Sequence, residues 1–322
     1  TRVRSSAASD VYKRQSPMSA AQVGLVSVKG APGCSSLALA LGWCWPGNAP
    51  VLVGEVDPAG ADLGARLELA AEPGLASLAA GRGPLSAEAL VAHLHPLGDR
   101  FGLLAGCVNP AEALAALGAL GPDLVGACRA AGRVGIWDCG RLAPATVPLV
   151  EACDVAVVVC GAEPAGLART VLAVSSLIRV VRVGVVVVGG GRRRRHAGPV
   201  AEAAAVLAAR LPGGAHVVGT VPSDRWGVRA AERGPARLVR RTPFGAEAAA
   251  IAIRVAELAA EVGTDQLPVS SHDRSATPPA AVPNATVSHA AVSHTTVSDA
   301  TAPDAAAPEA AVPRDALSGG GR

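Results

Sequence analysis

An α/β domain with a doubly wound, mostly parallel sheet of about seven strands and helices on both faces is the fold class that this sequence predicts. Two observations lead to it. Short valine-rich runs show no alternation with polar residues, as expected of strands that are buried on both faces. Segments of helical length, rich in Ala and Leu, separate these runs, which is the strand–helix alternation of a parallel sheet.

The expected elements follow one another in that alternating order. Strands are expected at 23–28, 51–56, 101–105, 134–137, 155–160, 183–188 and 216–219, and helices at 34–45, 110–120, 164–178 and 198–211. Asn109, Pro110 and Glu112 supply a start for the second of these helices: an N-cap, a proline at the first helical position and a carboxylate in the first turn. The segment 246–260 is apolar on much of its surface and is expected to be a helix that packs on the core.

Composition divides the chain into three parts. Residues 18–264 carry the alternating pattern and fit one domain. Residues 1–17 hold the only Tyr and one of the two Lys, and we interpret them as a non-native or disordered leader before Met18. Residues 265–322 repeat Ala, Pro, Ser and Thr with almost no large apolar side chains, so a disordered tail is expected because ordering entropy would not be offset by burial.

Charge, cysteine usage and hydropathy exclude several classes of protein. A net charge of +3 over 322 residues gives no global argument for nucleic-acid binding. Seven cysteines, none in a C-x-x-C pair, are expected to be reduced and buried. The sequence shows no signal-peptide pattern and no uninterrupted apolar stretch of spanning length, so we expect a cytoplasmic protein without a transmembrane segment.

A phosphate-binding loop is the first candidate for chemistry. The strand at 23–28 runs into Lys29-Gly30-Ala31-Pro32-Gly33-Cys34-Ser35-Ser36 and then into a helix. The backbone N–H groups of such a loop and the dipole of the helix favour an anion. Against the pattern G-x-x-x-x-G-K-[ST], Gly33 fits the second glycine and Ser35 the Mg²⁺-binding hydroxyl, but Val28 and Cys34 stand where the first glycine and the lysine belong.

Carboxylates follow two other predicted strands. Asp57 comes directly after 51–56, and Asp138 comes directly after 134–137. A carboxylate at the C-terminal end of a strand faces the ligand crevice of an open α/β sheet. An Asp that closes an apolar strand is also the arrangement that holds Mg²⁺ in phosphoryl-transfer proteins. The order of loop, Asp57 and Asp138 along the chain therefore favours a nucleotide site.

Together these motifs resemble those of the MinD/ParA family of P-loop ATPases. The loop at 29–36 is similar to the family's deviant Walker A sequence K-G-G-x-G-K-T-T, the segment 55–58 to its D-x-D-P segment, and 138–140 to the end of its Walker B strand. Residues 218–224, which include Pro222, are similar to its late G-x-[IV]-P-x-D turn. The resemblance covers roughly 22–260 and leans toward a divergent, actinobacterial branch and the pilus-localisation relatives called CpaE and TadZ.

The resemblance implies a nucleotide-binding regulatory or positioning protein, of the chromosome-partitioning, septum-site or pilus-localisation type. It also implies a homodimer, a further protein partner, and ATP with Mg²⁺ as ligands. Lys29, Gly30, Ala31, Pro32, Gly33, Cys34, Ser35, Ser36 and Pro222 would bind the nucleotide, and Ser35 and Asp138 would hold Mg²⁺ indirectly. Lys29 would reach the nucleotide of the partner subunit, and Asp57 would orient the attacking water.

Two departures from the family pattern bear on turnover. Cys34 replaces the lysine that holds phosphates within the same subunit, and Gly189-Gly190-Gly191 stand about where the family places an Asn that reads adenine. We therefore expect ATP turnover to be weak or absent. Two rivals stay open: an active ATPase that uses Lys29 or backbone amides, and a scaffold that binds no nucleotide. An iron–sulfur relative has little support without paired cysteines.

An arginine-rich loop, Arg192–Arg195, is a candidate surface for DNA. ParA-type members of the family bind DNA non-specifically through surface arginines, so the resemblance implies non-specific contacts there. A solvated loop explains the same residues, since no aromatic residues are interleaved with the arginines and no recognition-helix pattern accompanies them.

Overall fold

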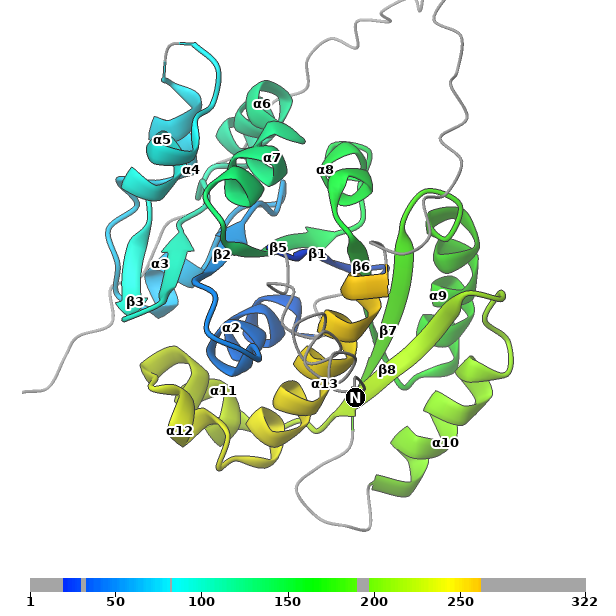
Figure 1. Cartoon of the computed structure of the whole chain (residues 1–322). Coiled ribbons are helices and arrows are strands. Elements are labelled where there is room, and N and C mark those ends of the chain that lie inside the picture. Colours follow the sequence, from blue (N-terminus) through cyan, green and yellow to red (C-terminus); the bar gives the residue numbers. More distant parts are fainter. Residues whose placement is uncertain (1–19, 30–32, 82, 190–196, 262–322) are drawn as a thin grey trace, which may run out of the picture. The chain divides into compact units, whose positions relative to one another are not determined.

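A single eight-stranded sheet lies at the centre of the part of the chain that the computed structural model describes, residues 20–29, 33–81, 83–189 and 197–261 (Figure 1). The strands are β1 Gln22–Ser27, β2 Val51–Glu55, β3 His95–Gly98, β4 Phe101–Leu104, β5 Val134–Arg141, β6 Val155–Gly161, β7 Arg182–Val188 and β8 Ala215–Val221. The leader 1–17, the tail 265–322, Gly30, Ala31, Pro32 and Arg192–Arg195 lie outside the described residues.

The sheet is doubly wound, in the order β3-β4-β2-β5-β1-β6-β7-β8. Every neighbouring pair is parallel except β3 and β4, which are antiparallel. The predicted fold class is confirmed, and all seven expected strands are present. The sequence analysis did not predict β3, because a four-residue edge strand that contains Pro96 has neither the length nor the apolar run of a buried strand.

Helices cover both faces of the sheet (Figure 1). Their bounds are α2 Cys34–Cys44, α3 Leu63–Arg66, α4 Leu75–Ala79, α5 Ala87–Ala92, α6 Pro110–Leu120, α7 Asp123–Ala130, α8 Val147–Ala152, α9 Pro164–Leu177, α10 Ala197–Ala208, α11 Arg225–Arg233, α12 Ala236–Val239 and α13 Pro243–Ala260. The four expected helices and the apolar helix at the end of the domain are confirmed. Asn109 caps α6 as expected, since its side chain accepts a hydrogen bond from the amide of Ala111 at 2.8 Å.

Two apolar cores hold these layers together. One core packs α2, α11, α12 and α13 against one face of the sheet, and the other packs helices from α4 to α10 against the opposite face. Strands β1, β2, β4 and β6 are almost wholly buried, which explains why their sequences are continuous apolar runs rather than alternating ones. All seven cysteines are buried and carry free thiols, as expected.

The strand that carries Asp138 differs from the expectation. Strand β5 does not end before Asp138; it continues to Arg141, so the carboxylate lies within the strand. The extension is stabilised by pairing with β1, where Ser27 stands opposite Arg141 after an irregularity in the register. Asp138 is opposite Glu55 on β2 and Leu25 on β1, so this part of β5 brings the ends of three strands together.

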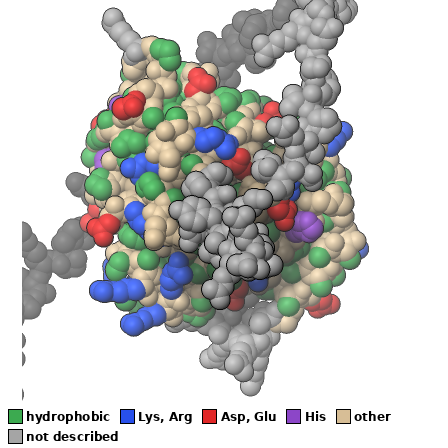
Figure 2. Space-filling model, viewed as in Figure 1, with side chains coloured by type: hydrophobic (Ala, Val, Ile, Leu, Met, Phe, Trp, Pro, Cys, Tyr) green, Lys and Arg blue, Asp and Glu red, His purple; other side chains and the backbone are tan. Residues whose placement is uncertain are grey.

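Basic side chains gather on the surface over α11 and α12 (Figure 2). The exposed arginines of this region are Arg225, Arg229, Arg233, Arg237, Arg240 and Arg241. Among the described residues no single helix is long and apolar enough to cross a membrane, although α6 and α7, bent by 65° at their junction, have the length and composition for it as a pair.

Candidate functional site

The first turn of α2 begins the candidate site. Gly33 stands at the N-cap with φ of 96°, a left-handed conformation that favours glycine. Its carbonyl accepts the first helical hydrogen bond, from the amide of Leu37 at 2.9 Å. Helix α2 therefore follows β1 after a short loop. The amides of its first turn, which have no partner within the helix, are the groups that an anion site requires.

Cys34 is buried at the start of this helix, with 5% of its surface exposed. Burial raises the pKa of its thiol strongly, and the carboxylate of Asp138 raises it further, so the side chain stays neutral at physiological pH. It therefore adds no charge of either sign to the loop, and it cannot act as a nucleophilic thiolate.

Ser35 and Asp138 lie together under the loop. Asp138 is 1% exposed, and burial raises its pKa to about 7, while a hydrogen bond with Ser35 works in the opposite direction. The backbone amide of Gly140 also donates to Asp138 Oδ1 at 3.3 Å. The serine hydroxyl and the buried carboxylate that were predicted to share a Mg²⁺ ion are thus brought into contact.

Glu55 organises the loop that follows β2. Its buried carboxylate accepts three backbone amides: Asp62 at 2.7 Å and Leu63 at 2.8 Å on Oε1, and Gly106 at 3.3 Å on Oε2. Burial raises the pKa of Glu55, although these three hydrogen bonds lower it. Glu55 therefore ties the loop 56–62 and the segment after β4 to the sheet, rather than facing a ligand.

Asp57 lies on that loop, beside Gly140 of β5. Its Oδ1 accepts the amide of Ala59 at 2.8 Å, and burial raises its pKa while Arg141 lowers it. Gly140 has φ of 60°, and a Cβ at that position would collide with the Asp57 carboxylate. The glycine therefore allows Asp57 to approach the end of β5, on the same side of the sheet as Asp138.

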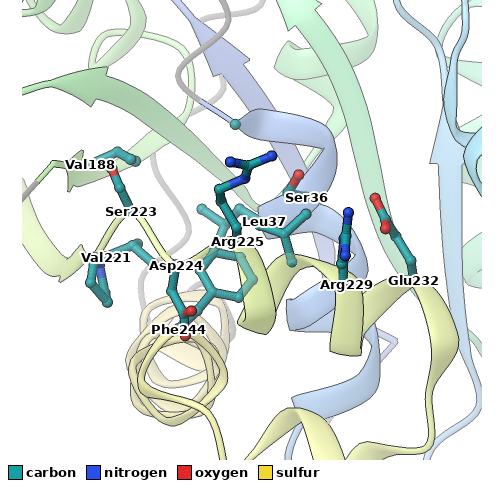
Figure 3. Close-up of a pocket in the computed structure, with 13 residues that line it drawn as sticks. Ser36, Leu37, Val188, Val221, Ser223, Asp224, Arg225, Arg229, Glu232 and Phe244 are labelled. Atoms are coloured by element: carbon teal, nitrogen blue, oxygen red, sulfur yellow. The ribbon is translucent and has the colours of Figure 1, made fainter. Parts of the chain in front are cut away.

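Two cavities flank the first turn of α2. The first has a volume of about 930 Å³, and Gly33, Ser35, Ser36, Asp57, Arg66 and Arg141 are among the residues that line it. The second has a volume of about 510 Å³, and its lining includes Leu37, Pro222, Arg225, Arg229 and Phe244 (Figure 3). Gly33 and Ser36 line both cavities, so the two spaces adjoin at the start of the helix.

The predicted site residues divide between these two spaces. Gly33, Cys34, Ser35, Ser36 and Asp57 line the first cavity, and Pro222 lies on the second; the buried Asp138 lines neither. Lys29 is exposed at the end of β1 and lines neither cavity. Gly30, Ala31 and Pro32 lie outside the described residues, as do Gly190 and Gly191.

An ion pair that sequence analysis did not identify lies next to the loop. Arg66 donates from Nη2 to Glu232 at 2.8 Å and to Ser36 Oγ at 2.9 Å, and its Nε lies 2.9 Å from the same carboxylate oxygen. Arg66 and Glu232 are 166 positions apart, so only the tertiary fold brings α3, α2 and α11 together here. A lone arginine after an Asp-rich turn carries no spacing signal that would have revealed it.

The described residues contain no group of three or more His, Cys, Asp or Glu side chains arranged to hold a metal ion. Mg²⁺ in nucleotide sites takes one or two protein ligands together with phosphate oxygens and water. Ser35 and the buried Asp138 are the residues that could hold such an ion.

Comparison with solved structures identifies the fold. Septum site-determining protein MinD from Pyrococcus horikoshii, complexed with Mg-ADP, is 18% identical and covers 74% of this chain and 97% of its own, with a TM-score of 0.57. A ParA family ATPase from Chlorobium tepidum is 14% identical over 73% of this chain and 99% of its own, with a TM-score of 0.58. Cyanothece McdA(D38A) in complex with ATP is 17% identical over 77% and 98%, with a TM-score of 0.56.

No family model matches the sequence, and no curated protein matches it. The similarity to solved structures is therefore one of fold: the chain has the P-loop α/β fold of the MinD and ParA ATPases.

Proposed function

We propose that this chain, which has the MinD/ParA fold, is a nucleotide-binding regulatory or positioning protein whose ATP turnover is weak or absent. The observation that carries the proposal is the contact between Ser35 and the buried Asp138 beneath the first turn of α2. Burying a charged carboxylate in an apolar core costs folding free energy unless a bound cation or a proton neutralises the charge. Solved proteins of this fold include a MinD with Mg-ADP and an McdA with ATP.

The two cavities suit the two ends of a nucleoside triphosphate. The larger cavity holds the helix N-terminus, Ser35 and Asp57, which are groups suited to phosphates, a divalent cation and a water. The smaller cavity is lined by Leu37, Pro222 and Phe244, whose apolar surfaces suit a base. In this arrangement Ser35 and Asp138 would hold Mg²⁺, whose charge would offset that of the phosphates.

Weak turnover follows from Cys34. A lysine at that position would place a positive charge on the β- and γ-phosphates, and a buried neutral thiol supplies none. A comparable positive charge, the arginine finger of related NTPases, is worth about 10³–10⁵ in rate. Asp57 lines the same cavity as Ser35 and would orient the attacking water, so in this proposal the loss concerns the charge that stabilises the transition state.

Lys29 has a different role in this proposal. Its exposed side chain at the end of β1 is available to a second copy of the chain, which fits the trans lysine that the family resemblance implies. The homodimer would therefore form in the presence of nucleotide. Changing Lys29→Ala is expected to reduce nucleotide-dependent dimerisation, measured by light scattering, without changing the melting temperature of the apoprotein.

Isothermal titration calorimetry tests nucleotide binding directly. The wild type is expected to bind ATP in the presence of Mg²⁺ and to bind it more weakly with EDTA, and Asp138→Asn is expected to remove most of that difference. The Glu261→Gln variant is a suitable control, because Glu261 pairs with Arg182 and lines neither of the two cavities. Absence of ATP binding with and without Mg²⁺ would favour the non-nucleotide scaffold instead.

A further inference from the structure

The loop lacks its own phosphate lysine, but several arginines surround it. Arg66 and Arg141 line the larger cavity, and Arg225 and Arg229 line the smaller one. A triphosphate with four negative charges needs positive charge within the crevice, since backbone amides contribute only partial charges. The question is which of these side chains is available to supply it.

One of the four, Arg66, is already engaged by carboxylates. Arg66 is held by Glu232 at 2.8 Å and lies 3.6 Å from Asp62, so its charge is balanced before any ligand arrives. Arg141 lies close enough to Asp57 to lower the pKa of that carboxyl. Arg66 therefore offsets acidic charge of the crevice, whereas Arg141 forms no ion pair with a described residue and acts on Asp57 through its charge alone.

Arg225 is placed differently. It is the first residue of α11, directly after the N-cap Asp224, and its side chain is exposed. Its side chain has no hydrogen bond or ion pair with any residue that the structure describes. Its guanidinium extends from α11 toward the first turn of α2, where Ser36 faces the same cavity (Figure 3).

Arg229 lies one turn farther along α11, beside Glu232 (Figure 3). A carboxylate therefore lies next to the Arg229 side chain, whereas Figure 3 shows none next to the guanidinium of Arg225. Among the arginines that line the two cavities, Arg225 combines a free guanidinium with a position beside the helix that carries Cys34.

We propose that Arg225 binds the nucleotide phosphates in the ground state, supplying from α11, at the smaller cavity, part of the positive charge that Cys34 removes from α2. The transferred phosphoryl group, beside Ser35 and Asp57 in the larger cavity, gains no cation from it, so turnover stays weak. A guanidinium binds phosphate oxygens through two parallel N–H groups, so it serves this purpose from a neighbouring helix, where a lysine on α2 would use a single ammonium. The positive charge would thus come from the smaller cavity, which is also proposed to bind the base. The contact between Arg225 and the phosphates would link α11 to the bound nucleotide.

This inference rests on the proposed nucleotide binding, and a double-mutant cycle separates the two. The four proteins are the wild type, Arg225→Ala, Cys34→Lys, and the variant with both changes, each titrated with Mg-ATP by calorimetry. Arg233→Ala is the matched control, because it removes the same charge from an exposed position of the same helix that lines neither cavity. Thermal melting of each variant checks that it folds.

Arg225→Ala is expected to weaken Mg-ATP binding by about 10- to 100-fold, the usual range for a hydrogen-bonded charge, while Arg233→Ala changes it less than about threefold. In the Cys34→Lys background the same change is expected to cost much less, since the lysine then occupies the role.

Three results would overturn the inference. Equal affinities for Arg225→Ala and Arg233→Ala would show that Arg225 does not contact the ligand. An equal loss with and without Lys at position 34 would assign Arg225 to the base or ribose. No binding by the wild type would overturn the proposed function together with this inference, whereas the first two results leave the proposed function standing.

Discussion

The two sides of the proposed nucleotide site, at the cavities beside the first turn of α2, differ in which charged groups they contain. On the side of β2 and β5, the three carboxylates Glu55, Asp57 and Asp138 are held by backbone amides, by Ser35 and by the approach that Gly140 allows. On the side of β1 and α2, the loop keeps its left-handed Gly33 and its serines but has a buried thiol at the lysine position. The acidic side thus keeps the groups that would hold Mg²⁺ and water in the proposed site, while the loop side has a neutral thiol at the position of a charged lysine.

This difference teaches that binding and turnover need not be lost together. Backbone amides and a Mg²⁺ site can hold phosphates in the ground state, whereas the transition state needs additional positive charge at the transferred group. The four predictions below test the acidic side and the loop side separately, in decreasing order of expected effect.

The largest expected effect concerns the buried charge of Asp138. Because its folded-state pKa is raised to about 7, the protein binds this proton more tightly when folded, and the stability that it contributes is lost as pH rises from about 4 through 7. Asp138→Asn removes this term, so between pH 5 and pH 8 the variant is expected to gain about 2–3 kcal/mol of unfolding free energy relative to the wild type.

Urea unfolding at the two pH values measures this gain. Glu55 and Asp57 also have raised pKa values and are present in both proteins; because their charges help to raise the pKa of Asp138, the comparison reports Asp138 together with this coupling. Parallel pH profiles for the wild type and Asp138→Asn would contradict the account of a buried, destabilising carboxylate.

The loop side is tested by Cys34→Lys. The new ammonium restores a charge at the start of α2, and Mg-ATP binding is expected to strengthen by about 1.5–3 kcal/mol, the value of a hydrogen bond to a charged group. Cys34→Ser, which adds no charge, is the control and is expected to leave the affinity nearly unchanged. Equal affinities for the two variants, by calorimetry, would mean that position 34 does not face the phosphates.

The approach of Asp57 to β5 is tested by Gly140→Ala. A side chain there is strained at φ of 60° and collides with Asp57, so a loss of about 1–3 kcal/mol in unfolding free energy is expected. Gly126→Ala is the matched control: Gly126 lies inside α7 with open space around it, and alanine is expected to stabilise the helix by about 0.5–1 kcal/mol. Opposite signs for the two variants, in chemical denaturation, are the expected result.

The smallest expected effect is that of removing residues 1–17 and 265–322. Their composition provides few apolar side chains for the core, so the fragment 18–264 is expected to melt within about 2 °C of the full chain. A fall of several degrees, measured by scanning calorimetry, would show that these segments stabilise the domain.

Much of the fold followed from local signals, but part of the site did not. Short apolar runs predict the buried strands, and Asn109 predicts the start of helix α6. Both signals extend over only a few residues of the sequence. The positions of Ser35, Asp57 and Asp138 at one edge of the sheet follow from the motif order, because parallel strands present their C-terminal ends together. Strand β3 was missed because pairing with β4, and not its own sequence, defines it.

The contacts that sequence could not supply join distant segments. Arg66 meets Glu232 across 166 positions, and Arg225 faces α2 only because α11 packs on it. The sequence also does not predict that β5 continues past Asp138, because this extension depends on the register in which β5 pairs with β1. These features arise from tertiary packing, for which no periodicity or spacing exists in a single sequence.

Steady-state hydrolysis of Mg-ATP by the wild-type protein measures directly whether the chain turns over ATP. An assay of phosphate release, run on the full chain with Asp57→Ala as the blank, is expected to give turnover near background because no lysine stands at position 34. A rate of about 1 s⁻¹ or faster, within the usual range of enzymes, and abolished by Asp57→Ala, would contradict the account and identify a working ATPase that has replaced its lysine.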